Sequence, residues 1–348
     1  MAGTKKSTLA LVAERAGVSI ASVSRVLNGL SASADVTERV QQAASDLGYV
    51  PDATARSLKV GRTEQIALAV ADAANPVYMS MMNEVSRVVA DGGYRLVLSS
   101  TGADPANELD LLSGLDRGFV DGLILSPLRV TDELVEHLRR SRIPIVVLGS
   151  LPEGVPLDNV RADSVIGMRL ALKHLAKQGR RRIAFLNGPV DTVPGATRLR
   201  GYLAAVEEYG TAQQADLQVE ADDFTFAAGL PAAEALLDQS SPDAIVCAND
   251  LLAVAALKAI ARRGLRVPQD IAVVGMDDTE IAQLVHPTLT SVDLGAAKRA
   301  RTAAKLLLRR LGDPDAEVRQ VVIEPKLRVR ESSAKDAARE PSRTEASR

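Results

Sequence analysis

The chain has little of what marks a redox, metal-binding or secreted protein. It contains one cysteine, Cys247, and three histidines in 348 residues, so we expect no disulfide, no metal site and no cofactor. No apolar run reaches about 18 residues, which predicts that no segment spans a membrane. The opening residues MAGTKKST lack the apolar core of a secretory signal, and we therefore expect a cytoplasmic protein.

The sequence motifs of common enzymes are absent as well. The chain has no P-loop, no Cys/His metal cluster and no G-x-S-x-G nucleophile elbow. Cys247 lies in the apolar pattern AIVCAND, which favours a thiol buried in a strand over a nucleophile. Asp277 and Asp278 resemble an acid and base pair, but adjacent residues on a strand face opposite ways. We therefore expect that the protein is not an enzyme.

The formal charge of −2 hides an uneven distribution. Residues 1–62 carry eight lysines and arginines against five acidic residues, a surplus of three positive charges, so the remainder of the chain is acidic. A basic end on an acidic body favours nucleic-acid binding at that end. Because the surplus per subunit is small, a dimer is needed to gather enough phosphate contacts.

A helix-turn-helix pattern lies at residues 8–28, TLALVAERAGVSIASVSRVLN. Thr8 can cap a first helix, Gly17 can supply a tight reversal, and Ser19 can cap a second helix. The second helix would bury Val23, Val26 and Leu27. The side chains left facing outward, where they can approach DNA, are those of Ser19, Ile20, Ala21, Ser22 and Arg25. On these residues alone, two short helices joined by a glycine remain an alternative.

A third helix and a short linker follow. Ser33 can cap a helix closed by Gly48, and Pro51 suits the first turn of another helix at residues 52–58. About seven residues are too few for a stable isolated helix, so we expect this segment to be disordered until it docks. The alternative is a plain linker at residues 50–63.

From residue 65 onward, apolar runs alternate with amphipathic segments. This alternation predicts parallel sheets covered by helices on both faces. The expected strands are residues 66–70, 96–99, 122–125, 145–148, 183–186, 244–247, 271–274 and 321–324. The expected helices are residues 77–90, 108–115, 133–140, 165–177, 199–207, 229–237 and 251–262. Residues 331–348 are rich in Ser, Ala, Arg and Glu, which is typical of a disordered tail.

Several motifs spread along the chain resemble the LacI/GalR family of bacterial transcription regulators. They are VSIASVSRVLN, LGYVPDATARSL, AND and VVGMDD, and the similarity covers residues 8–331. The resemblance implies a small all-α helix-turn-helix headpiece (1–49), a hinge helix or linker (50–63) and an α/β sensor domain (64–330). That domain would have the two-lobed, periplasmic-binding-protein-like fold with doubly wound parallel sheets.

The same resemblance implies which residues contact DNA. Leu58 matches the residue that wedges into the minor groove, with Ala55 beside it and Arg56 near the DNA backbone. The complete set that we assign to DNA is Thr8, Ser19, Ile20, Ala21, Ser22, Ser24, Arg25, Asn28, Ser33, Tyr49, Ala55, Arg56 and Leu58.

Polar residues that directly follow the apolar strands are candidates for ligand contact, since doubly wound sheets bind ligands at strand carboxyl ends. With Arg198 and Phe224, which match effector-contacting positions of the family, the expected effector-binding set is Asp72, Asn75, Tyr78, Ser126, Arg198, Phe224, Asn249 and Asp277. Arg198 could instead form a salt bridge between lobes. Asp250 is expected to cap the following helix.

Donors and acceptors around an aromatic ring suit a polyhydroxylated ligand, so a sugar or sugar derivative is the first candidate. The sequence departs from sugar-sensing relatives at Gly149, Ser150 and Ser164, and at Pro194 and Gly195 in the expected loop before Arg198. Nucleosides and other small metabolites therefore remain alternatives.

Together these observations predict a DNA-binding transcriptional regulator, by family habit a repressor. It would bind a palindromic operator as a homodimer, with an effector in the interlobe cleft modulating its affinity. Met79, Met81 and Met82 lie either on a dimer surface or in the core. The alternative functions are a solute-binding protein or a sugar-processing protein with the same two-lobed fold.

Overall fold

The computed structural model describes residues 8–50, 61–102, 104–115, 118–211 and 215–334. The chain divides into two compact units, with the boundary between Thr63 and Glu64. Expectations for Ala55, Arg56 and Leu58 lie outside the described residues. No helix among the described residues combines the length and apolar character needed to cross a membrane.

The first unit contains three helices, each of which begins at a hydroxyl side chain. Helices α1 (Leu9–Ala16), α2 (Ile20–Leu27) and α3 (Ala34–Asp46) are capped by Thr8, Ser19 and Ser33, whose side chains accept a backbone N–H of the first turn. Gly17 ends α1 with φ of 64°, a left-handed conformation that glycine adopts without steric cost. The helices close around a core of Val12, Ala13, Ala16, Val23, Val40, Ala43 and Ala44.

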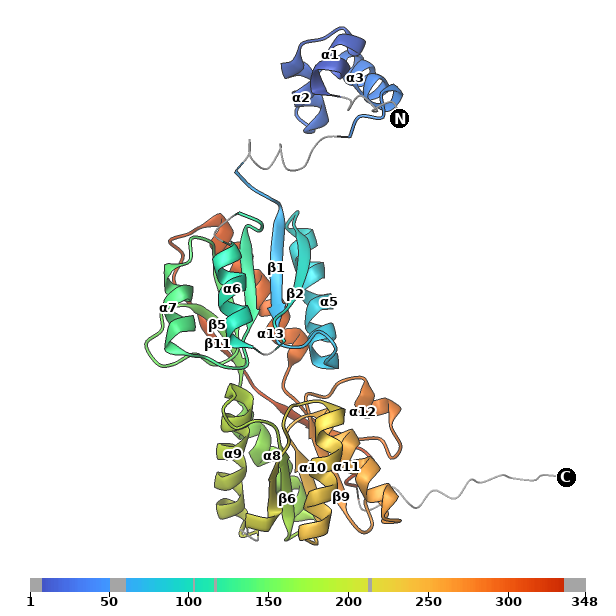
Figure 1. Ribbon diagram of the computed structural model, residues 1–348, viewed down its shortest axis with the longest axis vertical. Helices are drawn as coiled ribbons and strands as arrows, with labels where there is room; N and C mark the ends of the chain where they lie inside the picture. Colours follow the sequence, from blue (N-terminus) through green and yellow to red (C-terminus); the bar gives the residue numbers. More distant parts are fainter. Residues whose placement is uncertain (1–7, 51–60, 103, 116–117, 212–214, 335–348) are drawn as a thin grey trace, which may run out of the picture. The chain divides into compact units, whose positions relative to one another are not determined.

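The second unit contains two six-stranded sheets, one in each lobe (Figure 1). The first-lobe sheet has the order β11-β5-β4-β3-β1-β2 and is parallel throughout. Its strands are β1 (Gln65–Val70), β2 (Arg95–Ser100), β3 (Gly122–Ser126), β4 (Ile145–Leu148), β5 (Asp158–Ala162) and β11 (Gln320–Ile323).

The second-lobe sheet has the order β12-β10-β9-β8-β6-β7, and only β12 runs antiparallel to its neighbour. Its strands are β6 (Ile183–Asn187), β7 (Gln218–Glu220), β8 (Ala244–Cys247), β9 (Ala272–Met276), β10 (Thr290–Asp293) and β12 (Lys326–Arg328). The central strands of both lobes are fully buried, as expected from their apolar runs.

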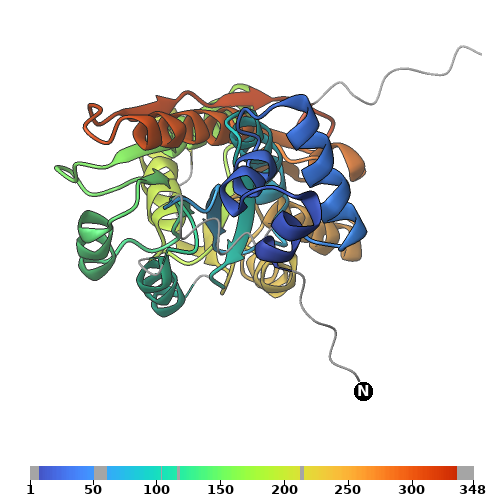
Figure 2. The same cartoon turned by 90° about the horizontal axis from the view of Figure 1, so that it is seen from above.

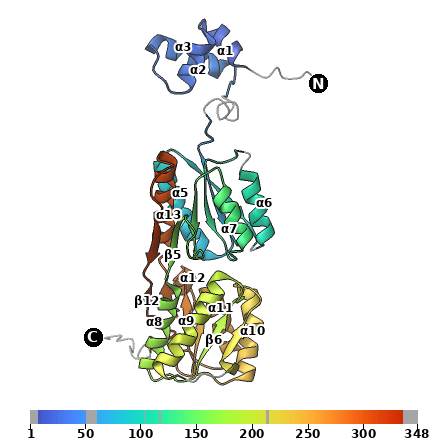
Figure 3. The same ribbon diagram turned by 90° about the vertical axis from the view of Figure 1, so that its left-hand side faces the viewer.

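Helices cover both faces of each sheet. In the first lobe, α5 (Pro76–Asp91) and α13 (Ala296–Gly312) share one apolar core, and α6 (Pro105–Leu115) and α7 (Asp132–Arg140) cover the other face (Figure 3). Seen from above (Figure 2), α13 in red lies opposite α6 and α7. In the second lobe, α8 (Ser164–Lys177) and α9 (Val193–Tyr209) lie opposite α10 (Phe226–Gln239) and α11 (Asp250–Arg262). A short helix, α12 (Ile281–Leu284), and a 3-10 turn, η1 (Ala215–Leu217), complete the lobe.

The chain crosses between the lobes three times, from β5 to α8, from β10 to α13 and from β11 to β12. The all-α headpiece and the doubly wound, two-lobed α/β unit were both predicted from the sequence and are confirmed. The elements β5, β7, β10, β12, α12 and α13 were not predicted, because polar residues interrupt their apolar patterns.

Two expectations about local structure were wrong. The disordered tail was expected to begin at residue 331, but Ser332 and Ser333 are fully buried, and Ser332 Oγ donates to the carbonyl of Val273 at 2.6 Å. Residues 331–334 therefore belong to the second lobe. Pro194 and Gly195 were expected in a loop, but they lie in the first turn of α9, where proline is tolerated because its missing N–H has no helical partner.

Candidate functional site

The surface of α2 carries the candidate DNA contacts of the first unit. Ser19, Ile20, Ala21 and Arg25 are exposed, whereas Val23 is fully buried against the other helices. Ile20 is 52% exposed, which leaves an apolar side chain available to a thymine methyl group. Among the described residues, the Arg25 side chain has no ion-pair or hydrogen-bond partner, while Arg15 pairs with Asp46 at 3.6 Å. Arg25 is therefore a free guanidinium on the exposed face.

Hydrogen bonds within the first unit hold several other predicted residues. The Ser19 and Ser22 hydroxyls lie 2.9 Å apart, and the Asn28 amide donates to the carbonyl of Ser24 at 2.6 Å. Thr8 and Ser33 cap their helices from exposed positions, so each remains accessible beside a helix N-terminus. Tyr49 is half-buried and packs against the headpiece core, an arrangement that stabilises the end of α3.

The second unit contains a cavity of about 280 Å³ lined by both lobes. All eight residues expected to bind an effector line it: Asp72, Asn75, Tyr78, Ser126, Arg198, Phe224, Asn249 and Asp277. They come from the carboxyl ends of β1, β3, β8 and β9, from helices α5 and α9, and from the loop before α10. The repeated strand order of the two sheets thus brings residues from far along the chain to one site.

Arg198, Asp277 and Phe224 form one wall of the cavity. Arg198 Nη2 donates to Asp277 Oδ1 at 3.4 Å, and the Arg198 guanidinium lies 5.9 Å from the centre of the Phe224 ring. All three are more than nine-tenths buried and belong to the second lobe, so the Arg198 ion pair does not bridge the lobes. Burial raises the pKa of Asp277, and Arg198 and Arg299 oppose this rise. The ring and the polar groups together can hold a ligand with an apolar face and hydroxyl edges.

The backbone at Asp277 has an unusual conformation. Asp277 and Asp278 have φ of 102° and 49°, a region that side chains rarely adopt. The turn directs Asp277 into the cavity, while Asp278 leaves it and accepts from Arg330 Nη2 at 2.6 Å. Such strain collects at ligand sites. The two carboxylates therefore do not share a site.

Asn249 lines the cavity as expected, but it also caps the following helix, the role that was expected of Asp250. Asn249 caps α11, because its Oδ1 accepts the Leu252 N–H at 2.8 Å, and its amide donates to the carbonyl of Phe224. Asp250 is not the cap. Its buried carboxylate accepts from Thr279 Oγ1 at 2.8 Å and Ser291 Oγ at 2.6 Å, and burial raises its pKa to about 7.

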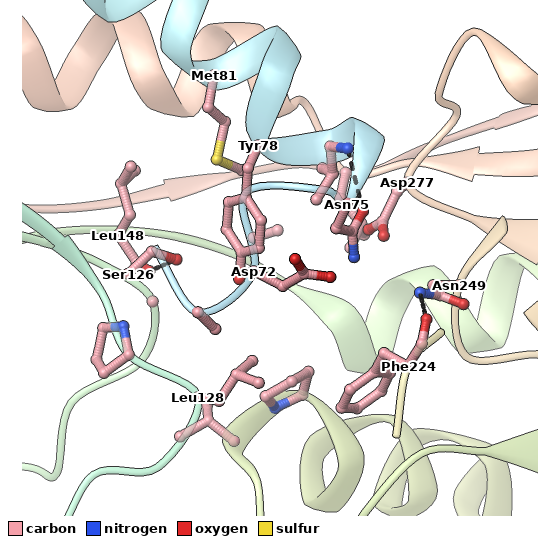
Figure 4. A pocket seen from close by; sticks show the side chains of 18 of the residues that line it. Asp72, Asn75, Tyr78, Met81, Ser126, Leu128, Leu148, Phe224, Asn249 and Asp277 are labelled. Atoms are coloured by element: carbon pink, nitrogen blue, oxygen red, sulfur yellow. Dashed lines mark hydrogen bonds between the residues drawn. The ribbon is translucent and has the colours of Figure 1, made fainter. Parts of the chain in front are cut away.

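The first lobe supplies the opposite wall. Asn75 caps α5 through a 3.1 Å bond from the Val77 N–H, and Ser126 Oγ donates to the carbonyl of Leu148 at 3.2 Å. Burial raises the pKa of Tyr78, and its neighbour Ser126 opposes the rise. The Asp72 side chain projects into the cavity (Figure 4), with Oδ1 accepting the Ala74 N–H. This wall therefore presents both donors and acceptors.

The sequence reasoning missed several lining residues, above all Arg161 and Arg299. Arg161 lies on β5 and Arg299 on the first turns of α13, two elements that the sequence did not predict. The basic run KRAR within an alanine-rich segment was the available signal for α13. In the part of the chain that the structure describes, no group of histidine, cysteine and acidic residues is arranged to hold a metal ion.

Comparisons with known proteins match both units. A model of bacterial regulatory proteins of the lacI family matches residues 8–52, and a periplasmic binding protein-like domain matches residues 172–333. The HTH-type transcriptional regulator CelR of Thermobifida fusca is 37% identical over 338 residues, which cover 94% of this chain and 98% of CelR.

Two solved structures match the whole architecture. A CelR–cellobiose complex has a TM-score of 0.72 at 35% identity, with coverage of 94% of this chain and 100% of that one. The lac repressor dimer bound to operator and the anti-inducer ONPF has a TM-score of 0.83 at 28% identity, with coverage of 94% and 99%.

Proposed function

This chain belongs to the lacI family of bacterial regulatory proteins, and we propose that it is a cytoplasmic repressor that binds operator DNA as a homodimer. The observation that carries the proposal is the combination, in one chain, of the exposed α2 face with its free Arg25 and the cavity between the lobes. The lac repressor match, a dimer on its operator, supports the dimeric arrangement.

In this proposal α2 enters the major groove. Arg25 donates to a guanine edge or a phosphate, Ile20 contacts a thymine methyl group, and the caps Thr8 and Ser33 lie near phosphates. The proposed contact surface also includes Ser19, Ala21, Ser22, Ser24, Asn28 and Tyr49. Twofold pairing places two α2 helices on a palindromic operator.

The segment that includes Ala55, Arg56 and Leu58 is proposed as the hinge, with Leu58 inserting into the minor groove. Leu58→Ala is expected to weaken operator binding while leaving ligand binding intact. Equal operator affinity of the variant and the parent protein would contradict the hinge.

The effector is proposed to be a sugar or a sugar derivative. A polyhydroxylated ring needs hydrogen-bond acceptors, donors and an apolar surface. The cavity supplies acceptors such as Asp72 and Asp277, donors such as Arg198 and Asn75, and the face of the Phe224 ring. The match to a CelR–cellobiose complex supports a sugar-type ligand. A nucleoside fits the same aromatic face, and a ligand screen separates the two.

In this proposal, effector binding and DNA binding are thermodynamically linked. A ligand that contacts both walls favours one relative arrangement of the lobes, and that arrangement changes the spacing of the paired DNA-binding segments. Coupling of this kind typically amounts to about 1–3 kcal/mol. On α5, Met79 is 46% exposed whereas Met81 is buried, so of these two Met79 is the one available to a dimer interface.

A thermal-melt screen of the purified protein tests the effector site first. Sugars, sugar derivatives, nucleobases and nucleosides are compared, and a ligand at about 100 times its Kd stabilises the fold by about 2.7 kcal/mol. A ligand that raises Tm must also change the Kd for operator DNA. Stabilisation without any change in DNA affinity contradicts the regulatory role and favours a solute-binding protein. Turnover of the ligand contradicts the proposal in favour of a sugar-processing enzyme.

A further inference from the structure

At one point of the cavity wall, two arginine side chains lie near a single carboxylate. Arg198, Arg299 and Asp277 influence one another electrostatically, so two cations face one carboxylate here, and Asp293 acts on Arg299 more weakly than Asp277 does. The three residues come from α9, α13 and the turn after β9. Their juxtaposition brings a first-lobe helix and the second lobe together at the cavity.

The donors of this cluster are incompletely used. Arg198 reaches Asp277 through Nη2 at 3.4 Å, a long bond, and its Nε–H is buried without an acceptor. Arg299 also has a buried Nε–H without an acceptor, and among the described residues it forms no ion pair. Burial lowers the pKa of Arg299, although Asp277 partly opposes this effect. A half-buried cation whose Nε–H is shielded from water and lacks an acceptor is stabilised by an incoming anion.

The remaining carboxylates of the cavity do not neutralise Arg299. Asp72 Oδ1 accepts the Ala74 N–H, and Asp223 Oδ1 accepts its neighbour's backbone N–H. Asp293 does not line the cavity; it contacts Arg328 at 3.3 Å and has a smaller electrostatic effect on Arg299 than Asp277 has. Arg161, on β5, adds a further cation that has no ion-pair partner in the described part of the chain. An anionic ligand group would therefore find its most favourable position beside Arg299 and away from Asp72.

We propose that the effector carries an oxyanion, either the carboxylate of a sugar acid or the phosphate of a sugar ester, and that Arg299 binds this group together with Arg198. The inference rests on the proposed role of the cavity as the effector site. Arg299 then selects acidic sugars over neutral ones, because a neutral ligand leaves its charge without a counter-ion. The hydroxyl-bearing ring lies toward Asp72, Asn75 and Phe224.

The test compares neutral sugars with their acidic counterparts on the full-length protein. The probes are glucose, glucuronate and glucose 6-phosphate; galactose and galacturonate; and ribose and ribose 5-phosphate, all at one ionic strength. Thermal melts identify binders, and calorimetric titration gives their Kd. We expect an acidic member to bind at least about tenfold more tightly than its neutral counterpart. Preference for a uronate or a phosphate ester distinguishes the two sources of the oxyanion.

Variants of Arg299 assign the preference to this residue. Arg299→Met is expected to weaken binding of the acidic sugar about tenfold or more and to change neutral-sugar binding less than threefold. Arg299→Lys keeps the charge and should retain part of the preference. Because Arg299→Met removes a half-buried cation whose Nε–H has no acceptor, we expect the variant to fold. Lys305→Met removes an exposed cation from the same helix, outside the cavity, and should bind both sugars like the parent protein.

The inference is overturned by a neutral sugar that binds as tightly as its acidic counterpart, by an Arg299→Met variant that loses binding of both equally, or by the lack of a melt shift with any acidic sugar. A shift equally large with inorganic phosphate alone also overturns it, since the site would then bind any oxyanion. None of these results touches operator binding, which is measured separately on a palindromic duplex selected by the protein from a randomised pool. Failure to select any duplex contradicts the proposed function instead.

Discussion

Arg129 of the first lobe and Asp191 of the second lobe form a two-bonded ion pair between the lobes, with Nε–Oδ2 at 2.7 Å and Nη2–Oδ1 at 3.0 Å. Beside it, the Val193 N–H donates to the carbonyl of Leu128 at 2.7 Å. Leu128 and Val193 themselves line the cavity. These bonds connect the loop after β3 to the start of α9, so they hold the lobes together next to the ligand site.

Breaking this ion pair should weaken effector binding. Arg129→Met is expected to raise the Kd for the effector about twofold to tenfold, because the arrangement that closes on the ligand loses a partly exposed ion pair. Calorimetric titration measures the change. Arg140→Met removes a 2.7 Å ion pair to Glu136 within α7 and serves as the matched control. If Arg129→Met and Arg140→Met bind the effector with equal affinity, the ion pair of Arg129 does not contribute to the arrangement of the lobes that closes on the ligand.

The free guanidinium on α2 should determine sequence preference. Arg25→Met is expected to reduce the ratio of operator to nonspecific binding about tenfold to a hundredfold, since a paired arginine–guanine contact contributes about 1–3 kcal/mol of discrimination. Fluorescence anisotropy with operator and scrambled duplexes measures this ratio. Arg15→Met, which removes the partner of Asp46, should leave the ratio unchanged. A uniform loss on all duplexes in the Arg25 variant would place Arg25 on phosphate.

Gly188 gives the Phe224 ring its position. A Cβ atom at Gly188 would lie 2.5 Å from the nearest atom of that ring, so Gly188→Ala must displace the aromatic face of the cavity. We expect a loss of about 1–3 kcal/mol in the free energy of unfolding from overpacking, and weaker effector binding. Urea denaturation and ligand titration measure the two effects. Gly114→Ala has open space around it and should bind ligand normally; an unaffected Gly188→Ala would show that the ring does not contact the effector.

Glu108 should make stability depend on pH. Burial raises its pKa to about 7, while the Leu128 backbone and Arg129 oppose the rise. The folded state therefore holds a proton that the unfolded chain releases near pH 4.5, so this contribution to stability is lost as pH rises from about 4.5 through about 7. We expect Glu108→Gln to lose less Tm than the parent protein between pH 5 and pH 8. Parallel pH profiles would exclude a role for Glu108.

The sequence was sufficient to predict those site residues that directly follow an apolar strand. The runs IVVL, AIVC and their counterparts are buried at the centres of the sheets, so the polar residues after such strands, among them Ser126, Asn249 and Asp277, had to emerge at one edge. The headpiece was equally predictable, because its caps and its apolar spacing are local features.

What the sequence did not reveal depends on contacts between distant residues. Asp250 follows a strand like its neighbours, but its partners Thr279 and Ser291 lie 29 and 41 residues away, so its buried role had no local indication. The strand β5 contains Asp158 and Arg161, and polar residues there conceal the apolar pattern. Arg299 was missed for a related reason, since the basic helix α13 reads as a surface segment although most of its alanines and two of its leucines are buried in the first lobe.

Operator binding measured with and without an effector tests the central claim most directly. The full-length protein first selects a duplex from a randomised pool, and the Kd for this duplex is then measured over a titration of the ligand that raises Tm. We predict selection of a palindromic sequence and a ligand-dependent change in Kd of about fivefold or more. A selected duplex whose Kd does not change at saturating ligand, or a failure to prefer any sequence, would contradict the account of this protein as an effector-controlled repressor.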